Sequence, residues 1–244
     1  MSIDDQVPTE PPEPPPARRE GIFGQGPAVI WFEAWPVLVT LGLIWIVFAA
    51  QLASAPLGLE ERMLSYGAFH PGNFRDGLWW TPLTSMFLHA GWLHVVMNSA
   101  ALVALGPGIA QRLGRDAFGG LLFGGLYVGC GLAGVALAGL LMPDAWLLGA
   151  SGAICGLWGA GARLVGPGRE ELHPIFSKAV GRSALSFLVM NLVVVVAAGA
   201  YGLASQQDLI LVSWQAHLGG FVLGLLLVGV LPVRFHWLKG LRGA

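Results

Sequence analysis

Six apolar stretches follow one another along the chain. They are Trp35–Ala53, Phe87–Ala110, Phe118–Leu141, Trp146–Leu164, Ala179–Leu203 and Val212–Leu231. Each is close to the roughly 20 residues that an α-helix needs to cross the hydrocarbon core of a bilayer. The pattern predicts an all-α membrane protein in which residues 28–234 form one bundle of six transmembrane helices.

The segments outside this bundle are polar. Residues 1–27 combine acidic side chains with a proline-rich run and have neither the apolar stretch nor the cleavage site of a secretory signal peptide. Such a composition cannot bury enough apolar surface to fold, so we expect a disordered, Pro-rich cytoplasmic tail. Residues 235–244 are expected to form a second, short cytoplasmic tail.

The distribution of Lys and Arg predicts the orientation of the bundle. Of the 13 basic residues, only Arg62 and Arg75 fall on one side of the predicted threading, and the others fall on the opposite side. Because the cytoplasmic connections of membrane proteins are enriched in Lys and Arg, both termini are expected in the cytoplasm.

Two segments depart from a simple alternation of spans and short turns. The first connection, residues 54–86, is long and contains Trp79 and Trp80, which are typical of a segment at the outer membrane–water interface. The outer end of the fourth stretch, residues 147–150, precedes a glycine-rich helix and is expected to be irregular. Irregular backbone at membrane depth is tolerated only against protein or a water-filled cavity.

Composition narrows the possible partners. Hydrophobic residues make up 55% of the chain and charged residues 11%, against about 25% charged in ordinary soluble domains. The lipid bilayer must therefore act as part of the solvent. No basic patch with interleaved aromatics is present, which argues against nucleic-acid binding. Cys130 and Cys155 lie within apolar runs and are interpreted as buried hydrophobes, so neither a metal nor a cofactor is expected.

Four polar side chains within the predicted spans gather in the outer half of the bilayer. His94 and Asn98 are one turn apart on the second span and share a face. Ser151 opens the fourth helix, and His217 lies near the outer start of the sixth. Measured from the basic residues at the cytoplasmic ends, both histidines stand about 25 Å up their helices and the serine about 18 Å. Ionisable groups within spans are rare and are functional candidates.

Glycines predict which helices touch. Gly152 and Gly156 form a small-residue stripe beside Ser151, and Gly220 and Gly224 form another on the face of His217. Such stripes allow membrane helices to approach backbone to backbone. They would bring the fourth and sixth helices together, with the serine near the histidine.

This arrangement is suited to nucleophilic catalysis. A serine hydroxyl becomes a nucleophile when a base such as histidine takes its proton, and the resulting oxyanion needs hydrogen-bond donors. No Asp or Glu lies in the outer half of a span, which favours a two-residue site over a Ser-His-Asp triad. Each residue also has a structural alternative: Ser151 as a helix N-cap, the histidines as hydrogen-bonded packing residues, and Asn98 as an interhelical contact. His89 fits a structural role at the end of the first connection.

Over most of residues 35–232 the chain resembles the rhomboid intramembrane serine proteases. Three motifs carry the resemblance, in the family's order and on the matching helices. The first, similar to the HxxxN signature, is His94-Val95-Val96-Met97-Asn98. The second, similar to GxSG, is Gly149-Ala150-Ser151-Gly152. The third, similar to AHxxGxxxG, is Ala216-His217 with Gly220 and Gly224. One departure is Thr81, which follows the two tryptophans where many members have an arginine.

The resemblance implies a function as well as a fold. It implies Ser151 as nucleophile, His217 as general base, and His94 and Asn98 as oxyanion stabilisers. It also implies a serine endopeptidase whose partners are membrane proteins with one transmembrane helix, entering laterally and cut near the outer face. The short loops favour a bacterial inner membrane as its location.

Two other functions fit part of the pattern. A catalytically inactive relative would bind membrane proteins without cutting them, but such relatives usually lack the serine or the histidine. A channel or transporter would use His94, Asn98 and His217 as a polar path. That interpretation leaves the GxSG turn unexplained, and the inner half of the spans offers no polar residues to complete the path.

Overall fold

The computed structural model describes residues 34–165, 171–205 and 213–234. Within these ranges the regular elements are all helices. The only β-type pairings among these residues are two isolated bridges, Phe69 with Leu147 and Leu164 with Leu172. The described part of the protein is therefore all-α, as the apolar pattern predicts. The two predicted tails, residues 1–27 and 235–244, lie outside the described residues.

Each predicted apolar stretch contains one helix. These are α1 (Trp35–Ser54), α5 (Trp92–Leu113), α6 (Ala117–Leu141), α7 (Ser151–Gly161), α8 (Lys178–Ser205) and α9 (Trp214–Leu227). Among the described residues, α1, α5, α6 and α8 are long and apolar enough to cross a membrane. Helices α7 and α9, with 11 and 14 residues, are shorter than the roughly 20 residues of a full span.

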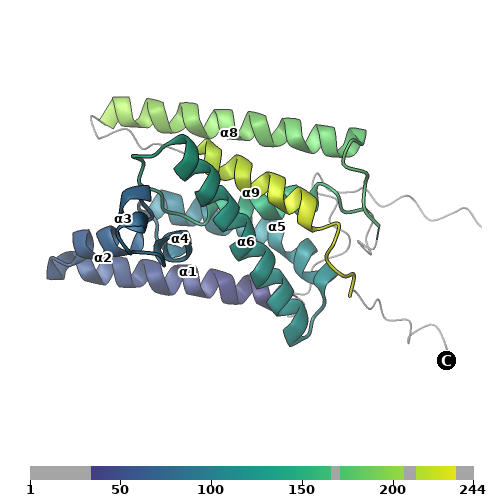
Figure 1. The fold of residues 1–244 in the computed structure, drawn as a ribbon, viewed down its shortest axis with the longest axis horizontal. Helices are drawn as coiled ribbons and strands as arrows, with labels where there is room; N and C mark the ends of the chain where they lie inside the picture. The colour runs from purple at the N-terminus through teal and green to yellow at the C-terminus, as the bar shows by residue number, and fades with distance from the viewer. Residues whose placement is uncertain (1–33, 166–170, 206–212, 235–244) are drawn as a thin grey trace, which may run out of the picture.

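Helix α7 lies in the middle of the bundle. Helix α7 contacts α5, α6 and α9, and α1 packs on the other side of α5. In Figure 1, α8 runs along one edge of the bundle and α1 along the opposite edge, with α5, α6 and α9 between them. Most residues of α7 are buried, so this helix is surrounded by protein rather than lipid and does not need the length of a full span.

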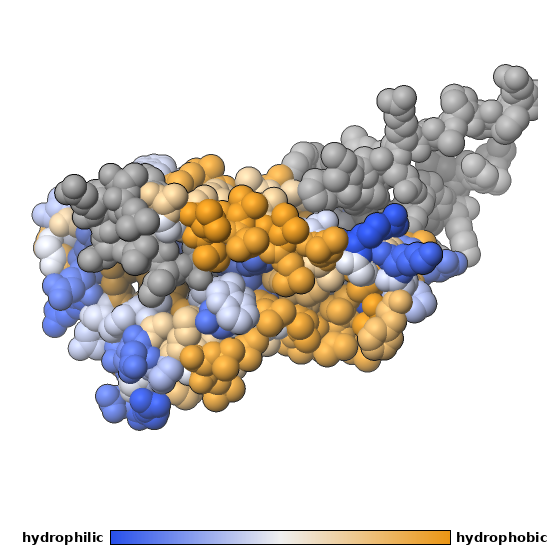
Figure 2. Space-filling model, turned by 90° about the horizontal axis from the view of Figure 1, so that it is seen from above, coloured by the Kyte–Doolittle hydropathy of each residue, from blue (hydrophilic) through white to orange (hydrophobic). Residues whose placement is uncertain are grey.

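The surface of the bundle is apolar around its middle. Figure 2 shows an apolar band across the visible face, with hydrophilic residues at both ends. Large apolar side chains such as Ile46, Leu93 and Leu192 are 64–71% exposed. An apolar surface this continuous is unfavourable in water and matches the hydrocarbon of a bilayer. The protein is therefore an integral multi-pass membrane protein.

The first connection is folded rather than extended. It contains the short helices α2 (Glu60–Gly67), α3 (Pro71–Arg75) and α4 (Thr81–Thr84), which gather beside the far end of α1 (Figure 1). Side chains hold the helices to one another: the Trp80 indole donates to the Tyr66 carbonyl (2.9 Å) and the Thr84 hydroxyl to the Gly67 carbonyl (2.7 Å). Thr81 is fully buried, and its hydroxyl donates to the Leu78 carbonyl within the same segment.

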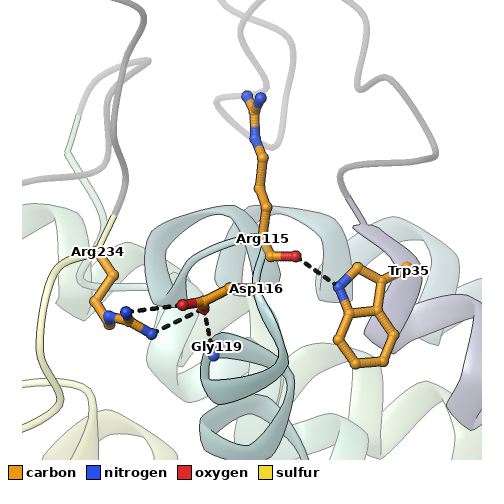
Figure 3. Close-up of polar contacts among 5 residues, drawn as sticks. All are labelled: Trp35, Arg115, Asp116, Gly119 and Arg234. Atoms are coloured by element: carbon orange, nitrogen blue, oxygen red, sulfur yellow. Dashed lines mark hydrogen bonds and ion pairs between the residues drawn. The ribbon is translucent and has the colours of Figure 1, made fainter.

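Polar contacts join the opposite end of the bundle (Figure 3). Asp116 caps α6 by accepting from the Gly119 N–H (2.9 Å), and its carboxylate makes two bonds of 2.8 Å with the Arg234 guanidinium. The Gly119 N–H, and after it Arg234, lower the pKa of Asp116. The Trp35 indole donates to the Arg115 carbonyl (2.9 Å), so the start of α1, the α5–α6 turn and the residues after α9 are connected.

Candidate active site

Ser151 is the first residue of α7, at the end of a turn that is held from two sides. The Phe69 and Leu147 backbones exchange two hydrogen bonds (2.9 and 2.8 Å), and the Gly149 N–H donates to the Ser85 carbonyl (2.8 Å). Gly149 has φ +119°, a backbone conformation that residues with a Cβ rarely adopt. The irregular residues 147–150 therefore end in a helix start, where backbone N–H groups lack intrahelical acceptors.

The structural alternative for Ser151 is wrong. The cap position of α7 is occupied by Ala150, which makes no side-chain capping bond. The Ser151 hydroxyl instead lies 2.8 Å from Nε2 of His217 on α9. Helix α9 is itself capped by Ser213, whose hydroxyl accepts from the Ala216 N–H (3.2 Å), so the histidine lies in the first turn of a fixed helix.

Four glycines explain why the two helices come this close. A Cβ on Gly220 would overlap the Gly152 backbone, and a Cβ on Gly224 would overlap the Gly156 backbone. A Cβ on Gly152 would lie 3.3 Å from the Ala216 carbonyl oxygen. Backbone atoms cannot move aside as the tip of a side chain can. Helices α7 and α9 thus meet along both glycine stripes, which places Ser151 beside His217.

His94 lies against the turn that leads to the serine. A Cβ on Gly149 would be 2.8 Å from its Nε2 atom, so the ring fills the space that glycine leaves open. Nδ1 accepts a hydrogen bond from the Ala90 N–H (3.2 Å). A neutral imidazole that accepts at Nδ1 carries its proton on Nε2. His94 therefore presents an N–H donor on the side of Gly149.

Asn98 lies one turn further along α5 and is buried. Its amide nitrogen donates to the His94 carbonyl (2.9 Å), which is a bond within the helix rather than to Ser151 or His217. His89 has the structural role expected from the sequence. Its backbone N–H and carbonyl each bond the Gln51 side chain of α1 at 3.0 Å, which fixes the segment before α5.

A family comparison covers the helices that carry these residues. The sequence model of the Rhomboid domain matches residues 76–234, which include α5 to α9 and all four candidate residues. The chain belongs to the rhomboid family.

Curated relatives of this rhomboid protein come from a plant and a bacterium. RHOMBOID-like protein 9, chloroplastic, of Arabidopsis thaliana is 34% identical over 80 residues, which are 33% of this chain and 18% of the relative. Rhomboid protease GluP of Bacillus subtilis is 26% identical over 164 residues, 67% of this chain and 28% of the relative. YdcA of the same bacterium is 28% identical over 123 residues, 50% of this chain and 57% of the relative. The chain spans less than two thirds of the length of each.

Asn191 is a polar contact of the rhomboid site that sequence reasoning did not single out. It lies on α8, and its side-chain oxygen is 2.5 Å from Nδ1 of His217. A signal was present, because Asn191 interrupts a long apolar run about 20 Å from Lys178, near the depth of Ser151. The sequence pattern alone does not reveal that α8 turns this residue towards α9.

The arrangement supplies the parts of an acyl-transfer site. A hydroxyl lies at hydrogen-bond distance from an imidazole, the hydroxyl belongs to a residue at a helix N-terminus, and a second imidazole presents an N–H beside the adjoining turn. Among the described residues, no group of three or more His, Cys, Asp or Glu side chains could hold a metal ion.

Proposed function

We propose that this rhomboid protein is an intramembrane serine endopeptidase that uses Ser151 and His217 as a catalytic pair. The main support is the 2.8 Å distance between the Ser151 hydroxyl and Nε2 of His217, across two helices joined at glycines. A serine that served only as packing would not need an imidazole as its partner.

The first half of the reaction forms an acyl-enzyme. The Ser151 oxygen attacks the scissile carbonyl carbon while its proton passes to Nε2 of His217. The tetrahedral intermediate then collapses, the C–N bond breaks, and the same proton moves from Nε2 to the leaving nitrogen. The serine oxygen is left esterified by the N-terminal part of the substrate, and the imidazole is neutral again.

The second half releases the product. Water attacks the ester carbon and gives one proton to Nε2 of His217. The bond from the carbon to the serine oxygen breaks, and this proton returns to that oxygen as the carboxylic acid product leaves. In both halves the oxyanion would be stabilised by the Ser151 backbone N–H, the His94 Nε2–H and the Asn98 amide. No metal or cofactor takes part in this scheme.

The substrates follow from the position of the site. Ser151 lies within a bundle whose surface is apolar, so we propose membrane proteins with one transmembrane helix as substrates, cut near the outer face. A helical peptide bond is shielded by its own hydrogen bonds, so the cleaved segment should contain residues that weaken a helix. The six apolar helices would all lie in the membrane, with both termini in the cytoplasm of a bacterial cell.

Covalent labelling tests the proposal directly. A fluorophosphonate probe should label the detergent-solubilised wild-type protein and should not label Ser151→Ala. Ser186→Ala, which removes an exposed hydroxyl on α8, is the matched control and should be labelled like the wild type. Cleavage of a fluorogenic transmembrane peptide should follow the same order. A folded wild-type protein that neither reacts with the probe nor cleaves any such peptide would instead be an inactive, binding relative.

A further inference from the structure

The Asn191 side chain has one defined orientation. Its amide nitrogen donates to the Phe187 carbonyl one turn earlier on α8 (2.9 Å), so its oxygen is the atom that faces His217. The opposite amide orientation would place an NH₂ group against the ring and a carbonyl-type oxygen against the Phe187 oxygen. That arrangement loses the bond within α8. The contact with His217 is therefore made by an acceptor.

An acceptor at Nδ1 determines which nitrogen of His217 carries the proton. The amide oxygen cannot donate, so the ring must donate from Nδ1, and in a neutral imidazole Nε2 then has a free lone pair. This lone pair points to the Ser151 hydroxyl, which donates to it at 2.8 Å. A general base needs this tautomer, because the other one would offer the serine an N–H instead of an acceptor.

The described part of α8 is anchored so as to present Asn191. In the most apolar part of α8 only 11% of the residues are buried, against 44% in the corresponding part of α6. Helix α8 is therefore held by few contacts. Phe187 stacks on Phe221 of α9 with ring centroids 4.2 Å apart, and the Trp158 indole donates to the Ser183 hydroxyl (3.1 Å). The Phe187 stack lies one turn before Asn191 and ties this part of α8 to the helix that carries His217, while the Ser183 bond lies one further turn away.

We propose that Asn191 is a positioning residue that holds His217 in the tautomer and orientation of a general base. The proposal rests on the proposed protease function and gives the site a third, uncharged member. When the serine proton moves to Nε2, both ring nitrogens carry hydrogen, and the Asn191 oxygen continues to accept from Nδ1. No proton is transferred to Asn191. The amide performs the orienting role that a carboxylate performs in a Ser-His-Asp triad, without placing a charge in the membrane.

No carboxylate on helices α5 to α9 competes with Asn191 for His217. Helices α5 to α9 have no Asp or Glu in their sequences. On α5, α6, α7 and α9 the other titratable side chains are His94 and Arg112 of α5, Tyr127 and Cys130 of α6, and Cys155 of α7. Lys178 and Arg182 lie at the far end of α8. Asn191 is therefore the group to test for control of the ring.

Nitrogen NMR of the imidazole tests this role without any turnover. In detergent, protein labelled with ¹⁵N-histidine should show His217 protonated on Nδ1 and not on Nε2, with the signals assigned by comparison with His217→Ala. Asn191→Leu keeps a similar volume but removes the acceptor, and should give a mixture of both tautomers. Ser183→Ala is the matched control on α8, since it removes a different interhelical bond, and should keep the wild-type tautomer. An unchanged tautomer in Asn191→Leu would overturn the proposal.

Steady-state kinetics provides the second measurement. A hydrogen bond to a group that becomes charged is worth about 10- to 100-fold in rate, so kcat of Asn191→Leu should fall by that factor with KM little changed. The acidic limb of its kcat/KM profile should move to lower pH, because the imidazolium has lost an acceptor. Asn191→Asp keeps an acceptor oxygen and should recover most of kcat. Equal losses in Asn191→Leu and Ser183→Ala, with no movement of the pH profile, would reduce Asn191 to helix packing.

The two proposals fail in different ways. A wild-type protein that shows no probe labelling and no cleavage would contradict the protease function, while the NMR measurement would still decide whether Asn191 sets the tautomer. An active wild type with Asn191→Leu indistinguishable from it in kcat, pH profile and tautomer would contradict only the role of Asn191.

Discussion

A Cβ on Gly220 would lie 2.8 Å from the carbonyl carbon of Gly152, and closer still to its oxygen. Gly152 directly follows Ser151, and Gly220 lies one turn after His217. The contact between these two glycines therefore sets the separation of the hydroxyl and the imidazole. The site depends on two backbones that touch, which is the packing that small residues permit in membrane proteins.

Gly220→Ala is expected to force α7 and α9 apart and to lower both melting temperature and activity. Overpacking typically costs about 1–3 kcal/mol, and here the obstacle is backbone, which cannot rotate away. Gly125→Ala on α6 is the matched control, because nothing lies within 4 Å of a Cβ at that position. Thermal unfolding in detergent and a peptide-cleavage assay measure both effects. Wild-type values for Gly220→Ala would show that the close approach is unnecessary.

Ser151 and His217 should behave as one unit in kinetics. Each alanine substitution is expected to reduce kcat by roughly 10⁶-fold, and the double mutant should be no worse, because the pair fails when either member is missing. Single-turnover cleavage of a transmembrane peptide in liposomes measures this. If the two losses multiplied in the double mutant, the residues would act independently and the shared mechanism would be wrong.

The oxyanion donors should contribute unequally. His94→Ala is expected to lower kcat by about 10²–10³-fold, the usual effect of losing one donor. Asn98→Ala should lower kcat by about 10²-fold or less. Water can replace part of its amide, and the amide already donates to the His94 carbonyl. Both losses should appear in kcat more than in KM. Melting temperatures are the control, since a matching loss of stability would indicate structural residues.

The orientation of the bundle can be tested independently of activity. The split of basic residues predicts that the α6–α7 connection, with Asp144, faces outward and that the α5–α6 turn, with Arg115, faces the cytoplasm. Single cysteines at these two positions, in a protein whose native cysteines are replaced, should react with a membrane-impermeant thiol reagent in whole cells only at position 144. Labelling at position 115 alone would reverse the predicted topology.

The Asp116–Arg234 pair should make stability depend on pH at the end of the bundle. The pKa of Asp116 is lowered in the fold, so its bonds stabilise the protein above the unfolded pKa of about 3.9 and are lost as pH falls through the lower folded pKa. Asp116→Asn should therefore reduce the melting temperature at pH 7, slightly because the pair is exposed. The difference from wild type should shrink in acid. Asp144→Asn serves as the control for removing a carboxylate from a loop, and a constant difference at all pH values would exclude the charge as the cause.

The comparison with the sequence is clearest at the first connection. Its tryptophans indicate an interfacial segment, but the three short helices α2, α3 and α4 are not predicted from them. Helices of four to eight residues are too short to be stable alone, and here bonds such as Trp80 to Tyr66 hold them together. The local sequence of each short helix does not indicate which residues elsewhere in the connection it will contact.

The sequence by itself determined the all-α class, the positions of the apolar helices and the four polar residues to examine. These follow from the length and composition of each stretch, because an apolar helix of sufficient length is stable in lipid wherever it occurs in the chain. Only the tertiary structure decided that Ser151 is not a cap, that Asn191 faces His217, and that α7 is enclosed by other helices. Those facts depend on which faces of separate helices meet. Such meetings are decided by the close approach of glycine backbones and by hydrogen bonds between helices, which are not encoded in any one helix.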